Sequence, residues 1–402
     1  MVDRHEFIKS LISPNNSKIV LLVMDGIGDI PDESGLTPLQ RANTPNLDAI
    51  ARESELGQSI PVLPGITPGS GPGHLGIFGY DPIKYQIGRG ILEALGSNVE
   101  VGPKDVVARG NFATIKDGIV IDRRAGRPSS EESAKIVELL NEKITKIEDV
   151  EIRFFPGKEH RFVLKLTGEG LGDNLEDADP QKEGKPIKYT SALSSDSEKT
   201  AKIINILLDK IKEVLKEESR MNFALVRGFS KHPHLPQFGE VFKLKAAAVA
   251  VYPMYKGIAK LVGMDVVSTG QTVEEEFDTV AKLWKEYDFF YIHVKKTDSY
   301  GEDGNYDSKV KVIEEVDSVL PKLLSLKPDV LIVTGDHSTP CLMKSHSFHP
   351  VPVMIKAKFV RRGLSDRFNE YECARGTLGT IKAVDIMTLA LAYAGRLKKF
   401  GA

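Results

Sequence analysis

Acids and histidines follow several short apolar runs of this 402-residue chain, and these side chains are the ones best suited to chemistry. Asp336 and His337 stand together directly after the apolar run 329–334. Alone, such a pair could make ordinary hydrogen bonds in a loop. However, four of the nine histidines lie at 293 or between 337 and 349, which is an uneven distribution. Carboxylate and imidazole ligands suit zinc, manganese or a similar divalent ion, so the pattern favours a metal site.

Two more acids occupy equivalent positions at the ends of other apolar runs. Asp25 follows the run 18–24, and Asp298 follows the run 289–294 after a short polar link. Short, continuous apolar runs are typical of buried parallel strands. Because ligands bind at the carboxyl ends of strands in open α/β sheets, we expect all these acids to lie close together. His293 lies inside an apolar run, so we interpret it as a core residue.

A glycine-rich segment, 67–74, contains a serine that could act as a nucleophile. Its glycines allow sharp turns and bring backbone N–H groups close to a phosphate. Ser70 stands just before a predicted helix start, where unpaired N–H groups favour an anion. A serine hydroxyl becomes a good nucleophile only when a base or a metal ion activates it. Taken alone, the segment could equally be a turn in which Ser70 caps the helix.

Basic residues gather in the middle of the chain. Three arginines fall within five positions at 123–127, and further basic residues are spread through the surrounding sequence. The planar guanidinium group matches the oxygen atoms of carboxylates and phosphates. A solvated basic turn would explain the same pattern, but we expect the cluster to face the predicted metal site. The candidate anion-binding residues are Arg109, Arg123, Arg124, Arg127, Arg161, Arg227 and Lys256.

The composition argues against several classes of function. With 54 basic and 56 acidic residues, the formal net charge of -2 gives no support for nucleic-acid binding. Cys341 and Cys373 are the only cysteines, which excludes a disulfide scaffold and fits a cytoplasmic location. Residues 1–14 lack the apolar core of a signal peptide. No segment approaches the roughly 18 apolar residues that span a bilayer, so we expect no membrane association.

The chain is longer than a single hydrophobic core supports, so we expect two lobes. The predicted core is an α/β domain, residues 1–105 and 221–402, with a mostly parallel sheet flanked by helices. A smaller α+β lobe is predicted as an insertion at 106–220, with three half-exposed strands and two helices. In chain order, these elements are expected at 118–122, 130–144, 151–155, 161–166 and about 196–217.

Four motifs together give the sequence a family resemblance. They are Met24–Asp29, Thr67–Leu75, Gly335–Pro340 and His346–Pro352. With these motifs, and over nearly its whole length, the chain resembles the archaeal-type, cofactor-independent phosphoglycerate mutases of the alkaline phosphatase superfamily. The resemblance implies an alkaline-phosphatase-like core and an isomerase of glycolysis and gluconeogenesis. Such an enzyme interconverts 3-phosphoglycerate and 2-phosphoglycerate through a phosphoserine, and it needs no 2,3-bisphosphoglycerate.

The resemblance also implies roles for individual residues. In that family the serine at the position of Ser70 takes the phosphoryl group. The ligands implied for one metal ion are Asp25, Ser70, Asp336 and His337. Asp298 and His346 match two ligands of a second ion. The inserted lobe would clamp the carboxylate and phosphate of the substrate with the basic residues named above.

The third ligand of the second ion departs from the family pattern. The family has a histidine four residues after the aspartate, where this chain has Glu302. A glutamate can bind manganese or magnesium, so we expect Glu302 as a ligand, with His349 or Asp303 as alternatives. Two manganese ions are expected, and magnesium, cobalt or zinc would also fit.

Two other kinds of function remain open on the same residues. A phosphatase or a phosphopentomutase would share the two-metal core, because substrate choice depends on the inserted lobe. A non-catalytic protein that binds a metal or another ligand would keep the fold, and Glu302 is the feature that permits this alternative. For the mutase, the expected partner is a small phosphoglycerate molecule.

Overall fold

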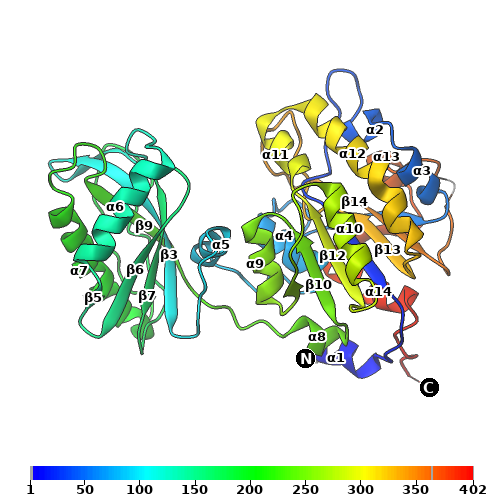
Figure 1. Cartoon of the computed structure of the whole chain (residues 1–402), viewed down its shortest axis with the longest axis horizontal. Coiled ribbons are helices and arrows are strands. Elements are labelled where there is room, and N and C mark those ends of the chain that lie inside the picture. Colours follow the sequence, from blue (N-terminus) through cyan, green and yellow to red (C-terminus); the bar gives the residue numbers. More distant parts are fainter. Residues whose placement is uncertain (1–2, 364, 402) are drawn as a thin grey trace. The chain divides into compact units, whose positions relative to one another are not determined.

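The computed structural model describes residues 3–363 and 365–401, which form two compact units (Figure 1). The first unit combines the two ends of the chain, Met1–Gln86 and Leu235–Ala402. The second unit is the continuous segment Ile87–His234. Each unit has its own sheet and its own hydrophobic core.

The first unit is built on an eight-stranded sheet in the order β11-β10-β12-β1-β13-β14-β2-β15. Its strands are β1 (Ile19–Met24), β2 (Glu55–Ile60), β10 (Ala246–Ala250), β11 (Asp265–Val266), β12 (Phe289–Val294), β13 (Val330–Thr334), β14 (Val351–Ala357) and β15 (Gly379–Lys382). Strand β14 runs antiparallel to both neighbours, and the other pairings are parallel. The central strands β1, β12 and β13 are buried along their full length, which explains their continuous apolar sequences. The prediction of a mostly parallel α/β sheet is confirmed.

Helices pack on both faces of this sheet (Figure 1). One face shares a core with α2 (Pro38–Arg41), α3 (Pro45–Ala51), α10 (Val273–Leu283) and α12 (Tyr306–Ser325). On the opposite face, His74 of α4 (Ser70–Ile77) packs against Tyr291 of β12. The unit also contains α1 (Arg4–Leu11), α8 (Phe238–Phe242), α9 (Pro253–Leu261), α11 (Lys296–Asp303), α13 (Glu370–Ala374), the 3-10 helix Ala383–Asp385 and α14 (Ile386–Tyr393).

The carboxyl ends of β1, β12 and β13 lie next to one another. The strand register pairs Met24 with Val294 and Val23 with Thr334. The segments that follow these residues therefore leave the sheet at the same edge, which is where open α/β sheets bind ligands. The charged residues in these segments include Asp25, Lys295, Asp298 and Asp336.

The second unit has an antiparallel sheet in the order β5-β6-β7-β3-β4-β8, and β9 also pairs with β3. The strands are β3 (Asp105–Lys116), β4 (Ile119–Asp122), β5 (Lys146–Ile147), β6 (Val150–Pro156), β7 (Arg161–Thr167), β8 (Lys185–Pro186) and β9 (Phe223–Lys231). The helices are α5 (Arg89–Gly96), α6 (Ser130–Lys143), the 3-10 helix Ser195–Ser197 and α7 (Glu198–Val214). Leu140 of α6 and Leu207 of α7 share one buried core with Phe112 and Phe162 of the sheet.

The second unit is wider than the lobe predicted at 106–220. Strand β9 pairs with β3 from Val106 to Ala113, and α5 packs against both strands. These long-range contacts place residues 87–105 and 221–234 with the second unit and not with the core. The sequence pattern did not reveal this pairing, because β9 is separated from β3 by most of the unit.

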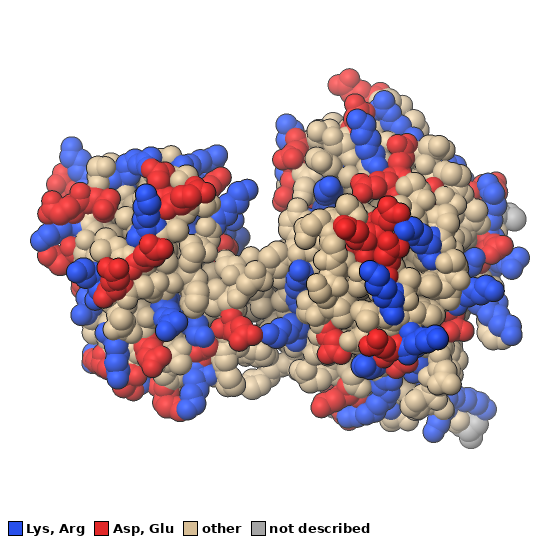
Figure 2. Space-filling model, in the orientation of Figure 1, with Lys and Arg blue, Asp and Glu red and all other residues tan. Residues whose placement is uncertain are grey.

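Charges of both signs are mixed on the surface. On the face shown in Figure 2, basic and acidic side chains lie close together over both units. None of the helices among the described residues combines the length and the apolar character that a membrane crossing requires. Cys341 and Cys373 are both buried and carry free thiols.

Candidate active site

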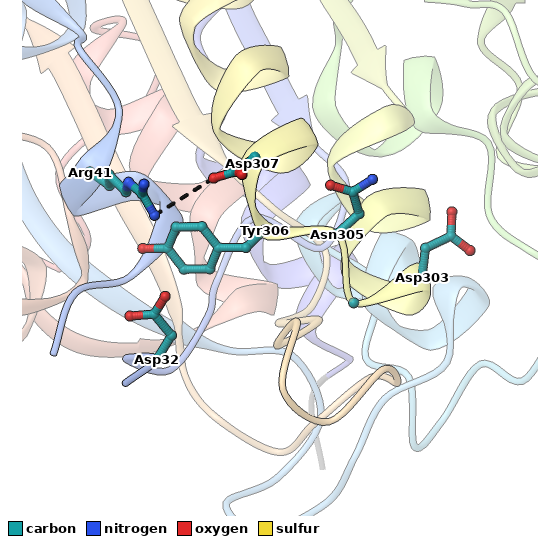
Figure 3. Close-up of a pocket in the computed structure, with 7 residues that line it drawn as sticks. Asp32, Arg41, Asp303, Asn305, Tyr306 and Asp307 are labelled. Atoms are coloured by element: carbon teal, nitrogen blue, oxygen red, sulfur yellow. Dashed lines mark ion pairs between the residues drawn. The ribbon is translucent and has the colours of Figure 1, made fainter. Parts of the chain in front are cut away.

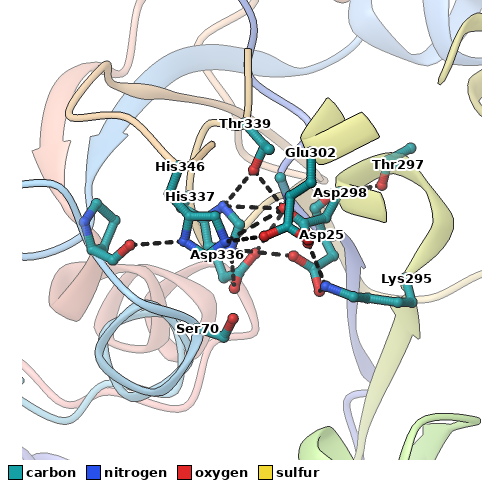
Figure 4. A network of polar contacts seen from close by, with 12 residues as sticks. Asp25, Ser70, Lys295, Thr297, Asp298, Glu302, Asp336, His337, Thr339 and His346 are labelled. Carbon is teal, nitrogen blue, oxygen red and sulfur yellow. Dashed lines mark hydrogen bonds and ion pairs between the residues drawn. The ribbon is translucent and has the colours of Figure 1, made fainter. Parts of the chain in front are cut away.

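Three aspartates and a histidine form a buried cluster at the carboxyl edge of the first unit's sheet (Figure 4). Asp25 directly follows β1, and Asp298 lies in the first turn of α11. Asp336 and His337 come shortly after β13. Burying three carboxylates together is unfavourable unless positive charge offsets them. The structure thus brings together the acids that the strand ends predicted, at a place that favours cations.

The first group of donor atoms joins Asp25, Asp336 and His337. Nε2 of His337 lies 3.3 Å from Oδ1 of Asp25 and 3.2 Å from Oδ2 of Asp336. Each of these three atoms is buried and makes no hydrogen bond to any residue that the structure describes. Because buried polar atoms are almost always hydrogen-bonded, three such atoms at one point indicate a ligand position. Two carboxylates and one imidazole suit a divalent metal ion.

The second group joins Asp298 and His346, with His337 also within reach. Nε2 of His346 lies 3.6 Å from Oδ1 of Asp298. Nδ1 of His346 lies 2.9 Å from the carbonyl oxygen of Pro68. Because a carbonyl oxygen only accepts, Nδ1 carries the proton and Nε2 keeps its lone pair. His346 is therefore ready to bind a cation through the nitrogen that is close to Asp298.

Lys295 supplies positive charge inside the cluster, and no pattern in the sequence identified it. Its Nζ donates to Oδ2 of Asp25 at 3.2 Å, to the hydroxyl of Tyr255 at 2.9 Å and to Oδ2 of Asp298. Burial opposes the charge of Lys295, but the two carboxylates outweigh it and raise its pKa. Burial also opposes the charge of Asp25 and by itself would raise the pKa of this carboxyl group. The charge of Lys295 instead holds the pKa of Asp25 well below its ordinary value.

His293 is also part of the cluster. The prediction that it is a core residue is confirmed, because β12 buries it. However, its Nε2 lies 3.0 Å from Oδ2 of Asp25, and its ring stacks on Tyr255 with centroids 3.7 Å apart. Burial lowers the pKa of His293. A neutral ring that donates to Asp25 holds this carboxylate in position.

Ser70 is the first residue of α4 and lies half-buried, with its hydroxyl toward the cluster (Figure 4). It lies one position inside the helix, since Gly69 is the N-cap residue. Nδ1 of His74, on the same helix, lies 2.9 Å from the carbonyl oxygen of Ser70 and 3.1 Å from Oδ2 of Asp336. Burial would lower the pKa of His74, but Asp336 raises it overall. A Cβ atom at Gly73 would lie 2.5 Å from the carbonyl oxygen of Asp336, so glycine permits this close approach.

Glu302 lies one turn after Asp298 on α11, at the rim of the second group. Its Oε1 is 3.8 Å from Nε2 of His346, and 54% of its side chain is exposed. Burial of the carboxyl group and the charge of Asp298 raise the pKa of Glu302. Glu302 is close to the second group, but its oxygens are not among the atoms that converge most tightly.

The two alternatives to the predicted glutamate ligand lie elsewhere. Asp303 lines an open pocket at the start of α12 (Figure 3). In that pocket, Arg41 pairs with Asp307 at 3.6 Å. His349 stacks its ring on the neighbouring Phe348. Within the described part of the chain, neither alternative belongs to a convergent group of donor atoms.

The second unit contains a basic pocket of about 230 Å³. The predicted anion-binding residues that line it are Arg109, Arg123, Arg124, Arg127, Arg161 and Arg227. The antiparallel register pairs Arg109 of β3 with Arg227 of β9, and Asn111 of β3 with Arg161 of β7. The seventh predicted residue, Lys256, lies on α9 of the first unit and not in this pocket.

A tight turn presents three of these arginines. The carboxylate of Asp122 accepts hydrogen bonds from the backbone N–H groups of Arg124 and Gly126, each at 2.7 Å. Ala125, Gly126 and Arg127 all have left-handed backbone conformations, with φ of 47°, 68° and 51°. Residues other than glycine adopt this conformation at a cost of order 1–3 kcal/mol each. The turn is therefore a specific structure and not simply a flexible basic loop.

Positive charge in the pocket exceeds what the neighbouring acids balance. Arg123 donates to Asp179 from Nη2 at 2.7 Å and from Nε at 3.3 Å. Burial lowers the pKa of Arg109 to about 10, and neighbouring arginines act in the same direction. The arginines that form no ion pair within the described part of the chain are Arg124, Arg127 and Arg161. The pocket therefore suits an anion with carboxylate or phosphate oxygens.

Three further polar residues line the pocket: Asn111, Glu159 and His160. Oδ1 of Asn111 and Nδ1 of His160 are buried and have no hydrogen-bond partner within residues 3–363 and 365–401. Burial, Arg161 and Arg124 lower the pKa of His160 to about 4, so its ring is neutral at neutral pH. Asn111 stands two positions after Arg109 on β3, so the period-two pattern of a strand could have identified it.

Comparisons with known proteins complete this description. A profile of the family described as 2,3-bisphosphoglycerate-independent phosphoglycerate mutase matches residues 51–221. A relative from Thermosipho africanus, named a probable 2,3-bisphosphoglycerate-independent phosphoglycerate mutase, is 78% identical over 402 residues, which cover 100% of both chains. The chain belongs to this mutase family. A relative of the same name from Thermotoga neapolitana is 68% identical over 402 residues, again with 100% of both chains covered. The solved structure of the cofactor-independent phosphoglycerate mutase from Thermoplasma acidophilum matches with a TM-score of 0.74 and 30% identity, over 94% of this chain and 100% of that one.

Membership of this mutase family and the donor atoms of the cluster both indicate a divalent metal site. Among the described residues, the inward-facing atoms of Asp25, Asp336 and His337 form no hydrogen bond, as expected of metal ligands. The donors are carboxylates and imidazoles, without thiolates. The family resemblance seen in the motifs is confirmed.

Proposed function

We propose that this chain interconverts 3-phosphoglycerate and 2-phosphoglycerate without a 2,3-bisphosphoglycerate cofactor. The observation that carries the proposal is the full-length identity of 78% to a relative named as such a mutase. A serine at a helix start, beside buried carboxylates and imidazoles, independently suits phosphoryl transfer. The reaction belongs to glycolysis and gluconeogenesis, and we assign the enzyme to the cytoplasm on that ground.

Ser70 is the proposed nucleophile. Its hydroxyl gives up its proton, and its oxygen forms a bond to phosphorus while the ester bond of the substrate breaks and the released glycerate oxygen takes up a proton. The other hydroxyl of the glycerate then gives up its proton and attacks the phosphorus, the bond from phosphorus to the oxygen of Ser70 breaks, and that oxygen takes up a proton, which restores the Ser70 hydroxyl. Backbone N–H groups at the start of α4 favour the negative charge of the phosphate in both steps. Lys295 holds a fixed positive charge beside two of the aspartates.

Two divalent ions, which we propose to be manganese, would bind in the cluster. The residues proposed for one ion are Asp25, Ser70, Asp336 and His337. Those proposed for the other are Asp298, Glu302 and His346. Such ions, when bound, favour the ionised serine hydroxyl and screen the charge of the phosphate. A set of carboxylate, hydroxyl and imidazole donors suits manganese or magnesium better than a soft metal.

The arginine pocket is proposed to bind the carboxylate and phosphate oxygens of the substrate. Asp179 orients Arg123, while Arg161 keeps an unpaired Nε. Bidentate contacts between guanidinium groups and carboxylate or phosphate give both affinity and orientation. Lys256 remains a proposed substrate contact on the first unit.

An assay coupled to enolase tests the proposal, because 2-phosphoglycerate yields phosphoenolpyruvate and 3-phosphoglycerate does not. With 3-phosphoglycerate and Mn²⁺ present, we expect phosphoenolpyruvate to form and a chelator to stop its formation. Release of inorganic phosphate would instead indicate a phosphatase. Isomerisation of a pentose phosphate would indicate a phosphopentomutase, and metal binding without any turnover would indicate a non-catalytic protein.

A further inference from the structure

Thr339 lies between the two groups of candidate metal ligands (Figure 4). Its Oγ1 is 2.6 Å from Oδ1 of Asp298 and 2.9 Å from Nδ1 of His337. All three residues are fully buried, so bulk water does not compete for these contacts. A single hydroxyl group therefore contacts one ligand from each group.

The direction of these hydrogen bonds follows from the chemistry of the groups. Asp298 is paired with Lys295, so it is a carboxylate that only accepts. The hydroxyl of Thr339 has one hydrogen, which it donates to Asp298. Its oxygen must then accept a hydrogen bond from Nδ1 of His337, and His337 therefore carries its ring proton on Nδ1.

This tautomer decides which group His337 can join. Its Nε2 keeps a lone pair, and this is the atom that lies 3.3 Å from Oδ1 of Asp25 and 3.2 Å from Oδ2 of Asp336. Nδ1, which lies 3.9 Å from Oδ1 of Asp298, is protonated and cannot bind a cation. His337 therefore belongs with Asp25 and Asp336. The other group must take its third ligand elsewhere, which favours Glu302.

We propose that Thr339 is a positioning residue that fixes the Nδ1-protonated form of His337 and couples the two metal sites. The inference rests on the metal-binding part of the proposed function and does not depend on the substrate. In the other tautomer, His337 would direct an N–H group at Asp25 and Asp336, where it would oppose a cation. The same hydroxyl orients Asp298, so its loss affects both groups.

Backbone contacts hold Thr339 in this position. Its N–H donates to the carbonyl oxygen of Gly28 at 3.0 Å. Its carbonyl oxygen accepts from Nζ of Lys309 at 2.9 Å, and Lys309 is itself fully buried and paired with Asp29 at 2.8 Å. Contacts within the protein therefore position the hydroxyl, as expected of a group that orients a ligand.

Titration of the full chain with Mn²⁺ tests this role. Thr339→Val keeps the shape of the side chain and removes the hydroxyl. We expect this variant to bind both ions about 10–100-fold more weakly, which is the usual effect of losing a group that orients a metal ligand. Thr339→Ser keeps the hydroxyl and should retain wild-type affinity. Thr334→Val is the matched control, because it removes another fully buried hydroxyl, which donates to the carbonyl oxygen of Pro352. This variant should bind both ions with wild-type affinity.

Wild-type affinity of Thr339→Val for both ions would overturn the proposal. Weaker binding of only one ion would overturn the coupling between the sites. Because these readouts measure metal binding alone, a negative result in the enolase-coupled assay would leave them unaffected.

If Thr339→Val does not fold, the wild-type chain still decides the question. Nitrogen NMR of the chain labelled in its histidines, with Mg²⁺ bound, distinguishes a protonated ring nitrogen from an unprotonated one. A His337→Gln variant assigns the signals. We expect the proton of His337 on Nδ1, and a proton on Nε2 would overturn the proposal.

Discussion

The acidic cluster of the first unit and the arginine pocket of the second unit are unbalanced in opposite directions. In the cluster, Asp25, Asp298 and Asp336 are buried together, and Lys295 offsets only part of their charge. In the pocket, six arginines converge while Asp179 pairs closely with one of them. Both regions also contain buried polar atoms without a hydrogen-bond partner. The sign of the unbalanced charge favours a cation as the ligand of the cluster and an anion as the ligand of the pocket.

The two regions also differ in how firmly their side chains are held. In the cluster, second contacts orient several of the ligands: Lys295 lies between Asp25 and Asp298, and the carbonyl oxygen of Pro68 accepts from His346. In the pocket, Arg123 is held by Asp179, whereas Arg161 keeps a free Nε. We therefore expect substitutions in the cluster to affect catalysis and stability, and substitutions in the pocket to affect mainly substrate affinity.

The largest effect is expected at Ser70. Ser70→Ala removes the proposed nucleophile, and mutase turnover should fall by at least about 10⁴-fold, because a missing serine nucleophile is not replaced by its neighbours. The enolase-coupled assay measures this loss. Ser54→Ala removes a buried serine hydroxyl elsewhere in the first unit and should remain active. Normal turnover of Ser70→Ala would show that the cluster does not work through a phosphoserine.

The next effect is expected at Lys295. In the metal-free protein, Lys295→Met leaves Asp25 and Asp298 without their common cation, and this should cost about 3–5 kcal/mol of unfolding free energy. Saturating Mn²⁺ should recover much of the loss, because the ions replace the missing charge. Thermal unfolding with and without Mn²⁺ measures both effects. Lys296→Met, at the exposed neighbouring position, is the control, and an equal loss in that variant would contradict the account.

A smaller effect on affinity is expected in the arginine pocket. Arg161→Gln should raise KM for 3-phosphoglycerate about 10–100-fold, since a hydrogen bond to a charged group contributes about 1.5–3 kcal/mol. The value of kcat should change less, because the chemistry takes place in the cluster. Arg153→Gln, at an exposed position on β6, should leave KM unchanged. An unchanged KM in Arg161→Gln would show that Arg161 does not contribute to substrate binding, which would contradict the role proposed for this pocket.

The smallest effect concerns the pH dependence of stability. His160 has a pKa of about 4 in the folded protein, below its ordinary value of 6.5. Between these values the unfolded chain binds a proton that the folded chain does not, so stability falls as the pH is lowered through this window. When the pH is lowered from about 7 to about 5, the free energy of unfolding should fall by about 1 kcal/mol less in His160→Gln than in the wild type. This figure allows for solvent screening. Urea unfolding at the two pH values measures the difference, and equal losses would show that the arginines do not destabilise the charged ring.

Much of the cluster could be predicted from the sequence because its ligands follow continuous apolar runs. Such runs identify buried strands to within a residue or two, as for β1 and β12, and parallel strands place their carboxyl ends together. Lys295 could not be predicted in the same way, because no pattern shows that its side chain folds back onto two acids. Thr339 was missed for a similar reason: its role depends on the distance between loops from different strands.

The density of arginines in the sequence predicted an anion-binding cluster in the second unit. The sequence did not predict which other residues line the pocket or where the second unit begins and ends. The three arginines of the turn are close in sequence, so local spacing identified them. Asn111 shares the period-two spacing of Arg109 on β3, whereas the place of His160 depends on the contact of β3 with the start of β7 and on burial, which a single sequence does not reveal. The wider limits of the second unit have the same origin, since β9 joins it through contacts with β3 that are distant in sequence.

We propose that Ser70 carries the phosphoryl group between the two hydroxyls of glycerate. Rapid quenching of the Mn²⁺-loaded enzyme during turnover of 3-phosphoglycerate, followed by proteolysis and mass spectrometry, detects such a phosphoserine. We predict one phosphoryl group on the peptide that contains Ser70, assigned to that side chain by fragmentation and absent when substrate is omitted. Phosphate on any other residue, or turnover without a phosphorylated Ser70 at any quench time, would contradict the account.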